Sequence, residues 1–140
     1  MTSSVPIPGT ADQSHVHIEI KGGVFVCVPN GVNLLTPYVL LEQEDWFEDE
    51  IKFVRRMLKP GMRVVDIGAS YGVYSLTAAR CVGATGRVWA FEPSSATAAC
   101  LARGIERNRY DTLHLIQAGL SNKNGQAKLM ISPNTELGFV

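Results

Sequence analysis

The feature that most constrains the fold of this chain is a run of apolar residues that leads directly into small ones, Val64-Val65-Asp66-Ile67-Gly68-Ala69-Ser70-Tyr71-Gly72. The continuous apolar residues predict a strand covered on both faces of a sheet, and the glycines predict a tight turn into a helix. A carboxylate, Glu92, ends the next apolar run. Small residues let a ligand approach the backbone, and a carboxylate at the end of the next strand is placed to accept hydrogen bonds from a ribose diol. The pairing therefore predicts a site for a nucleotide-type cofactor.

Apolar runs and helix-like segments alternate regularly after this feature. The pattern predicts a helix from Gly72 to about Val82, a strand over 87–91, a helix from Ser94 or Ser95 to about Arg107, and a strand over 113–117. Strands that alternate with helices form a parallel sheet with right-handed crossovers. The sequence thus predicts an α/β fold with a Rossmann-like parallel sheet, in which the loop 68–72 and Glu92 meet at one edge.

The chain divides into three parts. Residues 1–14 combine Ser, Thr, Pro and Gly without periodicity and are expected to form a flexible tail. Residues 15–58 are predicted to hold a β-hairpin, with strands over 15–20 and 24–28, and then a helix over about 44–58. Residues 59–140 hold the Rossmann-like unit and end with a turn at 123–125 and a short strand over 127–131.

Composition narrows the partners and the compartment. The 13 basic and 13 acidic residues cancel, and no basic cluster is interleaved with aromatic residues, so nucleic acid and membrane surfaces are not expected as partners. The expected partner is a small molecule or a glycan. The three cysteines have no CxxC spacing, and no signal or membrane-spanning segment is recognisable, which favours a cytoplasmic location.

The spacing of the glycines indicates which cofactor the site takes. The dinucleotide motif G-x-G-x-x-G requires glycine at positions 70 and 73, where this chain has Ser70 and Val73. The frame with Asp66, Gly68 and Gly72 instead resembles the first motif of class I S-adenosylmethionine-dependent methyltransferases. Nicotinamide-dependent oxidoreduction is therefore the weaker hypothesis, and a catalytically silent binding module is a further alternative.

A longer resemblance extends to the FkbM family of these methyltransferases. It rests on Val64–Gly72 with Ser75-Leu76, on Gly86-Arg87-Val88-Trp89-Ala90-Phe91-Glu92-Pro93, on Asn108 and on Gln117-Ala118-Gly119-Leu120-Ser121. Ser70 stands where the family usually has asparagine, which is expected to adjust cofactor affinity. The resemblance implies methylation of a hydroxyl group on a sugar, a lipid or a natural product. It also implies that S-adenosylmethionine is bound by Asp66, Gly68, Ala69, Ser70, Tyr71, Gly72, Glu92, Gln117 and Ala118.

Within that set, the resemblance places the loop 68–72 against the methionine portion, Glu92 at the ribose, and Gln117 or Ala118 near adenine. No general base stands out, because His15, His17 and His114 are expected to be solvent-facing or packed, and no metal site is indicated. The acidic residues Glu48 and Glu50 are interpreted as a solvated helix face, with the alternative that one of them reaches the cofactor amine.

The resemblance also bears on the size of the folded unit. A complete class I methyltransferase resembles a larger sheet, of which this chain supplies the first three strands, so the unit in residues 59–140 is expected to be truncated. The first strand would then present an unpaired edge. We therefore expect marginal stability, aggregation, or formation of a homo-oligomer through this exposed edge.

Overall fold

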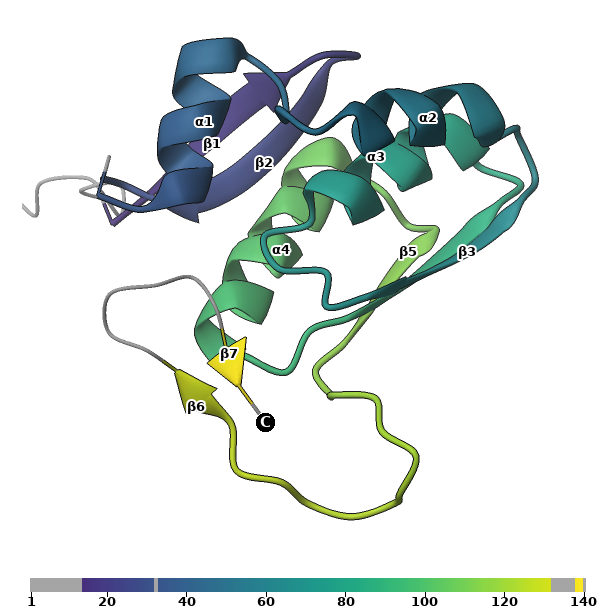
Figure 1. The fold of residues 1–140 in the computed structure, drawn as a ribbon. Coiled ribbons are helices and arrows are strands. Elements are labelled where there is room, and N and C mark those ends of the chain that lie inside the picture. The colour runs from purple at the N-terminus through teal and green to yellow at the C-terminus, as the bar shows by residue number, and fades with distance from the viewer. Residues whose placement is uncertain (1–13, 32, 132–137, 140) are drawn as a thin grey trace, which may run out of the picture.

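The computed structural model describes residues 14–31, 33–131 and 138–139 (Figure 1). The predicted tail lies outside these residues, except for Ser14. The elements are, in chain order, β1 His15–Ile20, β2 Val24–Pro29, α1 Leu35–Gln43, α2 Asp49–Met57, β3 Arg63–Ile67, α3 Val73–Val82, β4 Arg87–Phe91, α4 Ser95–Asn108, β5 Leu113–Ile116, β6 Met130–Ile131 and β7 Gly138–Phe139.

A parallel sheet of three strands, in the order β3-β4-β5, organises the chain. Its register aligns Val64 with Val88 and Val88 with Leu113, all of which point toward the helices. The helices α3 and α4 connect these strands and lie on one face of the sheet (Figure 1). The predicted α/β fold with a Rossmann-like parallel sheet is confirmed.

The hairpin of β1 and β2 packs on the outer side of α3 and α4, separate from the sheet (Figure 1). Asn108, the last residue of α4, fixes this contact. Its Oδ1 accepts from the Phe25 backbone N–H at 2.9 Å, and its Nδ2 donates to the Phe25 carbonyl oxygen at 2.6 Å. A Cβ at Gly104 would make only ordinary contact with the hairpin, 3.7 Å from the Phe25 carbonyl oxygen, but it would lie 3.1 Å from Cδ1 of Leu76, so the glycine lets α4 pack closely on α3. The predicted hairpin is thus confirmed, and it adds a third layer to the fold.

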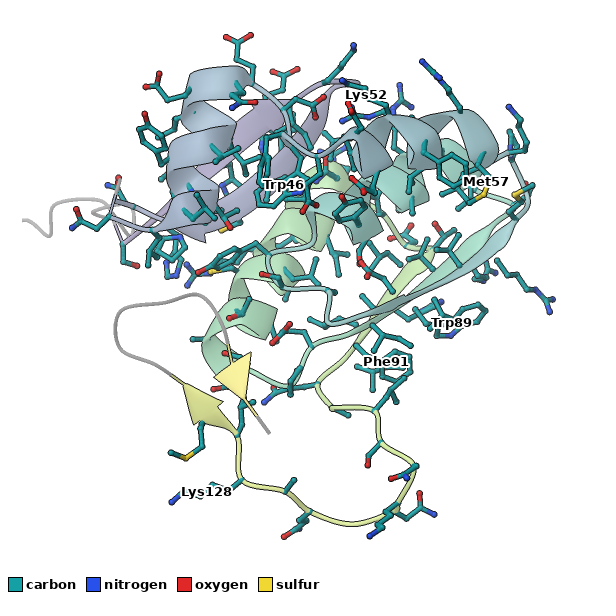
Figure 2. All side chains as sticks on the ribbon, in the orientation of Figure 1. Trp46, Lys52, Met57, Trp89, Phe91 and Lys128 are labelled. Carbon is teal, nitrogen blue, oxygen red and sulfur yellow. The ribbon has the colours of Figure 1, made fainter. Side chains whose placement is uncertain are left out.

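The opposite face of the sheet is uncovered among the described residues. Val65 and Ile67 are 57% and 65% exposed, so the expectation of a first strand buried on both faces is wrong. Trp89 and Phe91 project from β4 on the same side (Figure 2). Continuous apolar character shows that both faces can be covered, but the described part of the chain covers only one. The exposed face therefore leaves apolar side chains in contact with solvent.

The segment before the sheet contains two helices where the sequence predicted one over about 44–58. The first, α1, was not expected because it has apolar residues on all sides, a proline in its first turn and no polar side chain at its N-cap, Leu34. Its C-cap is Glu44, whose φ of 53° is left-handed. Phe47 then lies outside both helices, and only Ile51 of α2 is fully buried. Two short helices thus position the connecting residues 44–48 beside α3.

Two further expectations concern the ends of the described chain and membranes. The predicted strand over 127–131 is reduced to β6, which pairs with β7 in an antiparallel ribbon. No helix in the described ranges has the length and apolar character needed to cross a bilayer.

Gly72 combines a left-handed backbone with close packing against a side chain of the core. It is the N-cap of α3 with a φ of 87°, and a Cβ there would lie 2.2 Å from Cδ1 of the fully buried Leu101. We expect Gly72→Ala to lower the free energy of unfolding by about 2–4 kcal/mol, through backbone strain and overpacking together. Denaturant unfolding measures this loss.

Gly22→Ala is the matched control, because Gly22 has a φ of 93° and a Cβ at this position would have no atom within 4 Å. It should cost only the backbone term, about 1 kcal/mol. Equal losses for the two variants would contradict the packing of Gly72 against Leu101.

Candidate functional site

The loop between β3 and α3 contains three residues in the left-handed region of backbone conformation. Gly68, Ser70 and Gly72 all have left-handed φ values, of 77°, 52° and 87°. The N–H groups of Gly68 and Ala69 both donate to the Phe91 carbonyl oxygen at 2.9 Å, which fastens the loop to the end of β4. Ser70 therefore occupies a conformation that asparagine or glycine adopts more easily. Hydrogen bonds from the loop backbone to the end of β4 and to Glu92 hold it there.

Glu92 provides the strongest of these contacts. Its side chain is 7% exposed, and its two oxygens accept from the backbone N–H groups of Ser70 and Ser94, each at 2.8 Å. Ser94 is the N-cap of α4, so one carboxylate joins the loop to the start of the next helix. Each carboxylate oxygen can accept more than one hydrogen bond, so capacity for a ligand hydroxyl remains. Sequence reasoning predicted the ligand role of Glu92 and missed this structural one.

Asp66 lies near the end of β3, and its side chain is bonded to the first turn of α3. Its Oδ2 accepts from the Ser75 hydroxyl at 2.5 Å. Burial raises the pKa of the Asp66 carboxyl above its usual range, and the hydrogen bonds from Ser75 only partly offset this effect. The carboxylate therefore lies in a partly desolvated position at the carboxyl end of β3, where it helps to fix the loop and is available to a positively charged ligand group.

A cavity of about 210 Å³ adjoins this loop. Five of the predicted site residues line it, and a further four residues come from α1, the connection 44–48 and α3. The lining residues are Thr36, Trp46, Asp66, Gly68, Ala69, Ser70, Tyr71, Val73 and Tyr74. The structure thus brings Asp66 and most of the loop together around one space, with Glu92 bonded to the loop directly beside it.

The remaining predicted residues lie at the same end of the sheet but do not line the cavity. Gly72 begins α3, and its N–H donates to the Ala69 carbonyl oxygen at 2.8 Å. Gln117 and Ala118 follow β5, and the Ile116 carbonyl oxygen accepts from the N–H groups of both Glu92 and Ala118. They are therefore neighbours of Glu92 through the backbone, and Gln117 is exposed.

Sequence reasoning missed the aromatic wall of the cavity. Trp46 and Tyr74 both donate to Oε2 of Glu48, the indole N–H at 2.7 Å and the phenol hydroxyl at 2.8 Å. These hydrogen bonds, that of Trp46 first, lower the pKa of the Glu48 carboxyl. The interpretation of Glu48 as part of a solvated face is thus wrong, since it is half-buried, whereas Glu50 is exposed. A tryptophan within an acidic segment was the one available signal.

The arrangement fits a ligand that combines a ribose with a positively charged group. The loop leaves space beside Gly68, where a Cβ would meet no atom within 4 Å. A buried carboxylate lies at the end of β4 and a second, partly buried one at the end of β3. Such a site can bind and orient a cofactor at the edge of the sheet, which is where open α/β folds bind their ligands.

Known proteins share this fold. No family model matches the chain. A ribosomal RNA large subunit methyltransferase E from Sorangium cellulosum is 45% identical over 51 residues, which cover 36% of this chain and 24% of that protein. The solved structure of P. horikoshii TYW2 in complex with MeSAdo is similar with a TM-score of 0.55 and 19% identity, over 77% of this chain and 37% of the other. Trm5b from Pyrococcus abyssi gives a TM-score of 0.56 and 17% identity, over 77% and 29%.

The two solved structures show that the described sheet and helices have a fold that known proteins share, and the match of sequence is to a methyltransferase. The matched regions cover well under two-thirds of the length of each of these proteins.

The expectation that nucleic acid is not a partner is wrong, because the relative from Sorangium cellulosum is a ribosomal RNA methyltransferase. The expectation rested on a net charge of zero and on the lack of a basic cluster interleaved with aromatic residues along the sequence. The net charge sums over the whole chain, and a linear cluster does not show which residues the fold brings together. The sheet register, for example, places the exposed Arg63 and Arg87 side by side at the start of β3 and β4.

The raised pKa of Asp66 predicts a specific pH dependence of stability. The folded chain binds the Asp66 proton more tightly than the unfolded chain, so this carboxyl group contributes less to the free energy of unfolding as the pH rises above about 4. Asp66→Asn removes the titration and keeps an oxygen that can accept from Ser75. We therefore expect the stability of the original chain relative to Asp66→Asn to fall between about pH 4 and pH 7.

Denaturant unfolding of both proteins across this pH range measures the difference. The carboxyl groups with lowered pKa values, Asp45, Glu48 and Asp49, titrate with the opposite sign but are common to both proteins and cancel. A difference that grows in favour of the original chain as the pH rises would refute the assignment.

Proposed function

We propose that this chain binds S-adenosylmethionine beside the loop 68–72 and forms the cofactor-binding part of a methyltransferase. The observation that carries the proposal is the hydrogen bond from the Ser70 N–H to Glu92. It puts the glycine-containing loop and a carboxylate in direct contact at the carboxyl edge of a parallel sheet, where open α/β folds bind ribose-containing cofactors. The similarity of sequence to a ribosomal RNA methyltransferase supports the same cofactor.

The proposed roles follow from the positions of the residues. The backbone of Gly68–Gly72 would lie against the methionine portion, and Asp66 would face its positive charge. Glu92 would accept hydrogen bonds from the ribose hydroxyls with the acceptor capacity that Ser70 and Ser94 leave. Gln117 and Ala118 would lie near adenine. The Ile116 carbonyl oxygen accepts from the N–H groups of both Glu92 and Ala118, which places this segment beside Glu92.

Bound S-adenosylmethionine supplies an activated methyl group on its sulfonium, so the chemistry required of the protein is mainly orientation. Holding two reactants in a reactive geometry can contribute about 7–11 kcal/mol toward the barrier. The loop and the two carboxylates are rigidly fastened to β4 and α3, which suits them to this task.

Two acceptors have specific support. The relative from Sorangium cellulosum favours RNA. The FkbM-like motifs favour a hydroxyl group of a sugar, a lipid or a natural product. The two proposals overlap chemically, because RNA itself presents ribose hydroxyls. Incorporation of a labelled methyl group into RNA, compared with small glycans, separates them.

Calorimetric titration with S-adenosylhomocysteine tests cofactor binding. We expect saturable binding that Glu92→Gln weakens by about 10- to 100-fold, because hydrogen bonds to a charged group are each worth about 1.5–3 kcal/mol. Glu106→Gln, an exposed carboxylate on α4, is the matched control and should leave the affinity unchanged. Thermal unfolding establishes that each variant is folded.

Gly68→Ala gives an independent variant in case Glu92→Gln unfolds, since its Cβ meets no protein atom but adds a methyl group to the cavity wall. Its cost to stability is the backbone term of a left-handed position, about 1 kcal/mol. Tighter binding of NADH than of S-adenosylhomocysteine would support the oxidoreductase alternative instead. Binding without methylation of any acceptor would support the silent module. No binding of either ligand by the folded chain would defeat the proposal.

A further inference from the structure

The cavity beside the loop has an aromatic wall of which the recognised motifs include only Tyr71. Trp46 comes from the connection between α1 and α2, Tyr71 from the loop, and Tyr74 from the first turn of α3. Figure 2 shows Trp46 in the connection that passes between α1 and α2. Three aromatic rings from separate segments thus border one space of about 210 Å³.

The wall is held in place by a partly buried hydrogen-bond arrangement and not by packing alone. Glu48 accepts from both the Trp46 indole and the Tyr74 hydroxyl at a single oxygen, Oε2. This bond set ties the connection 44–48 to α3, which is the helix that follows the loop. Trp46 therefore keeps a fixed position relative to the loop backbone on the far side of the cavity.

The charge at the cavity has one sign. Asp66 is among the described residues that line it, and Glu48 is bonded to two of them, whereas no lining residue is basic. Aromatic faces carry negative potential and attract cations, most strongly when the cation is partly removed from water. Rings and carboxylates around a partly enclosed space together favour a positively charged group over a neutral one.

From this geometry we infer that the cavity is a cation subsite, in which Trp46 contacts a positively charged group of the cofactor and Glu48 positions Trp46. The inference rests on the proposed binding of S-adenosylmethionine and extends the site to residues 46–48, outside the glycine loop. The cofactor carries two such groups, the α-ammonium and the sulfonium. The subsite makes binding depend on charge as well as on the adenosine portion.

Three ligands separate these contributions. S-adenosylmethionine carries both cations, S-adenosylhomocysteine carries only the ammonium, and 5′-methylthioadenosine carries neither. We expect Trp46→Leu to lower the affinity for S-adenosylmethionine by about 3- to 30-fold, which is the range of a cation–π contact. The affinity for 5′-methylthioadenosine should change by less than about 2-fold. An equal loss for S-adenosylhomocysteine identifies the ammonium as the bound group, and a loss confined to S-adenosylmethionine identifies the sulfonium.

Two further variants guard against a purely structural effect. Trp46→Phe keeps an aromatic face and should retain most of the affinity for the charged ligands, although it lacks the N–H that bonds Glu48. Phe53→Leu removes an exposed aromatic ring on α2, away from the cavity, and should change nothing. Calorimetric titration of all four proteins with the three ligands, with thermal midpoints measured alongside, completes the experiment.

The outcomes also distinguish this inference from the proposed function. If Trp46→Leu lowers the affinity for all three ligands equally, or for none of them, the inference of a cation subsite is wrong and the proposal of cofactor binding still stands. If the original chain, while folded, binds none of the ligands, then the proposed function itself fails and the subsite fails with it.

Discussion

The carboxylate of Glu92 is the constraint on which the candidate site depends. It accepts one backbone N–H from the loop after β3 and one from the N-terminus of α4, while the neighbouring Phe91 carbonyl accepts two more from the loop. A buried carboxylate with fewer donors would be costly, so these amide groups must stay in place. The loop therefore has its left-handed shape before any ligand arrives, and ligand binding does not have to order it.

The elements around this carboxylate could be predicted because their signals are local. The apolar runs that form β3, β4 and β5 are bounded by glycines and by the Ser94 cap, and these features need no knowledge of the rest of the chain. The helix α1 could not be predicted in the same way, since it has no polar cap and no polar face. Its stability comes from packing against the hairpin, which is a tertiary effect.

The candidate site, like the fold, was predictable only where its signals are local in sequence. The loop and Glu92 were predictable because their spacing is set by one helix and one strand. The aromatic wall was not predictable, because Trp46 is held at the cavity by tertiary contacts. Its indole N–H bonds Glu48, which also accepts from Tyr74 of α3. The exposed face of β3 was mispredicted for a related reason, since residue type reports what a strand can tolerate on each face and not what covers it.

The attachment of the hairpin through Asn108 affects how the chain opens. A two-stranded ribbon is marginally stable alone, so β1 and β2 depend on α4, which is joined to Phe25 across 83 positions of sequence. Cys27 of β2 and Cys100 of α4 are both buried at this contact. Their thiols become reactive toward solvent when the two layers separate, whereas the half-buried Cys81 on α3 does not lie in this contact. The rate at which Cys27 and Cys100 are labelled, followed separately from Cys81, therefore reports undocking of the hairpin apart from unfolding of the sheet.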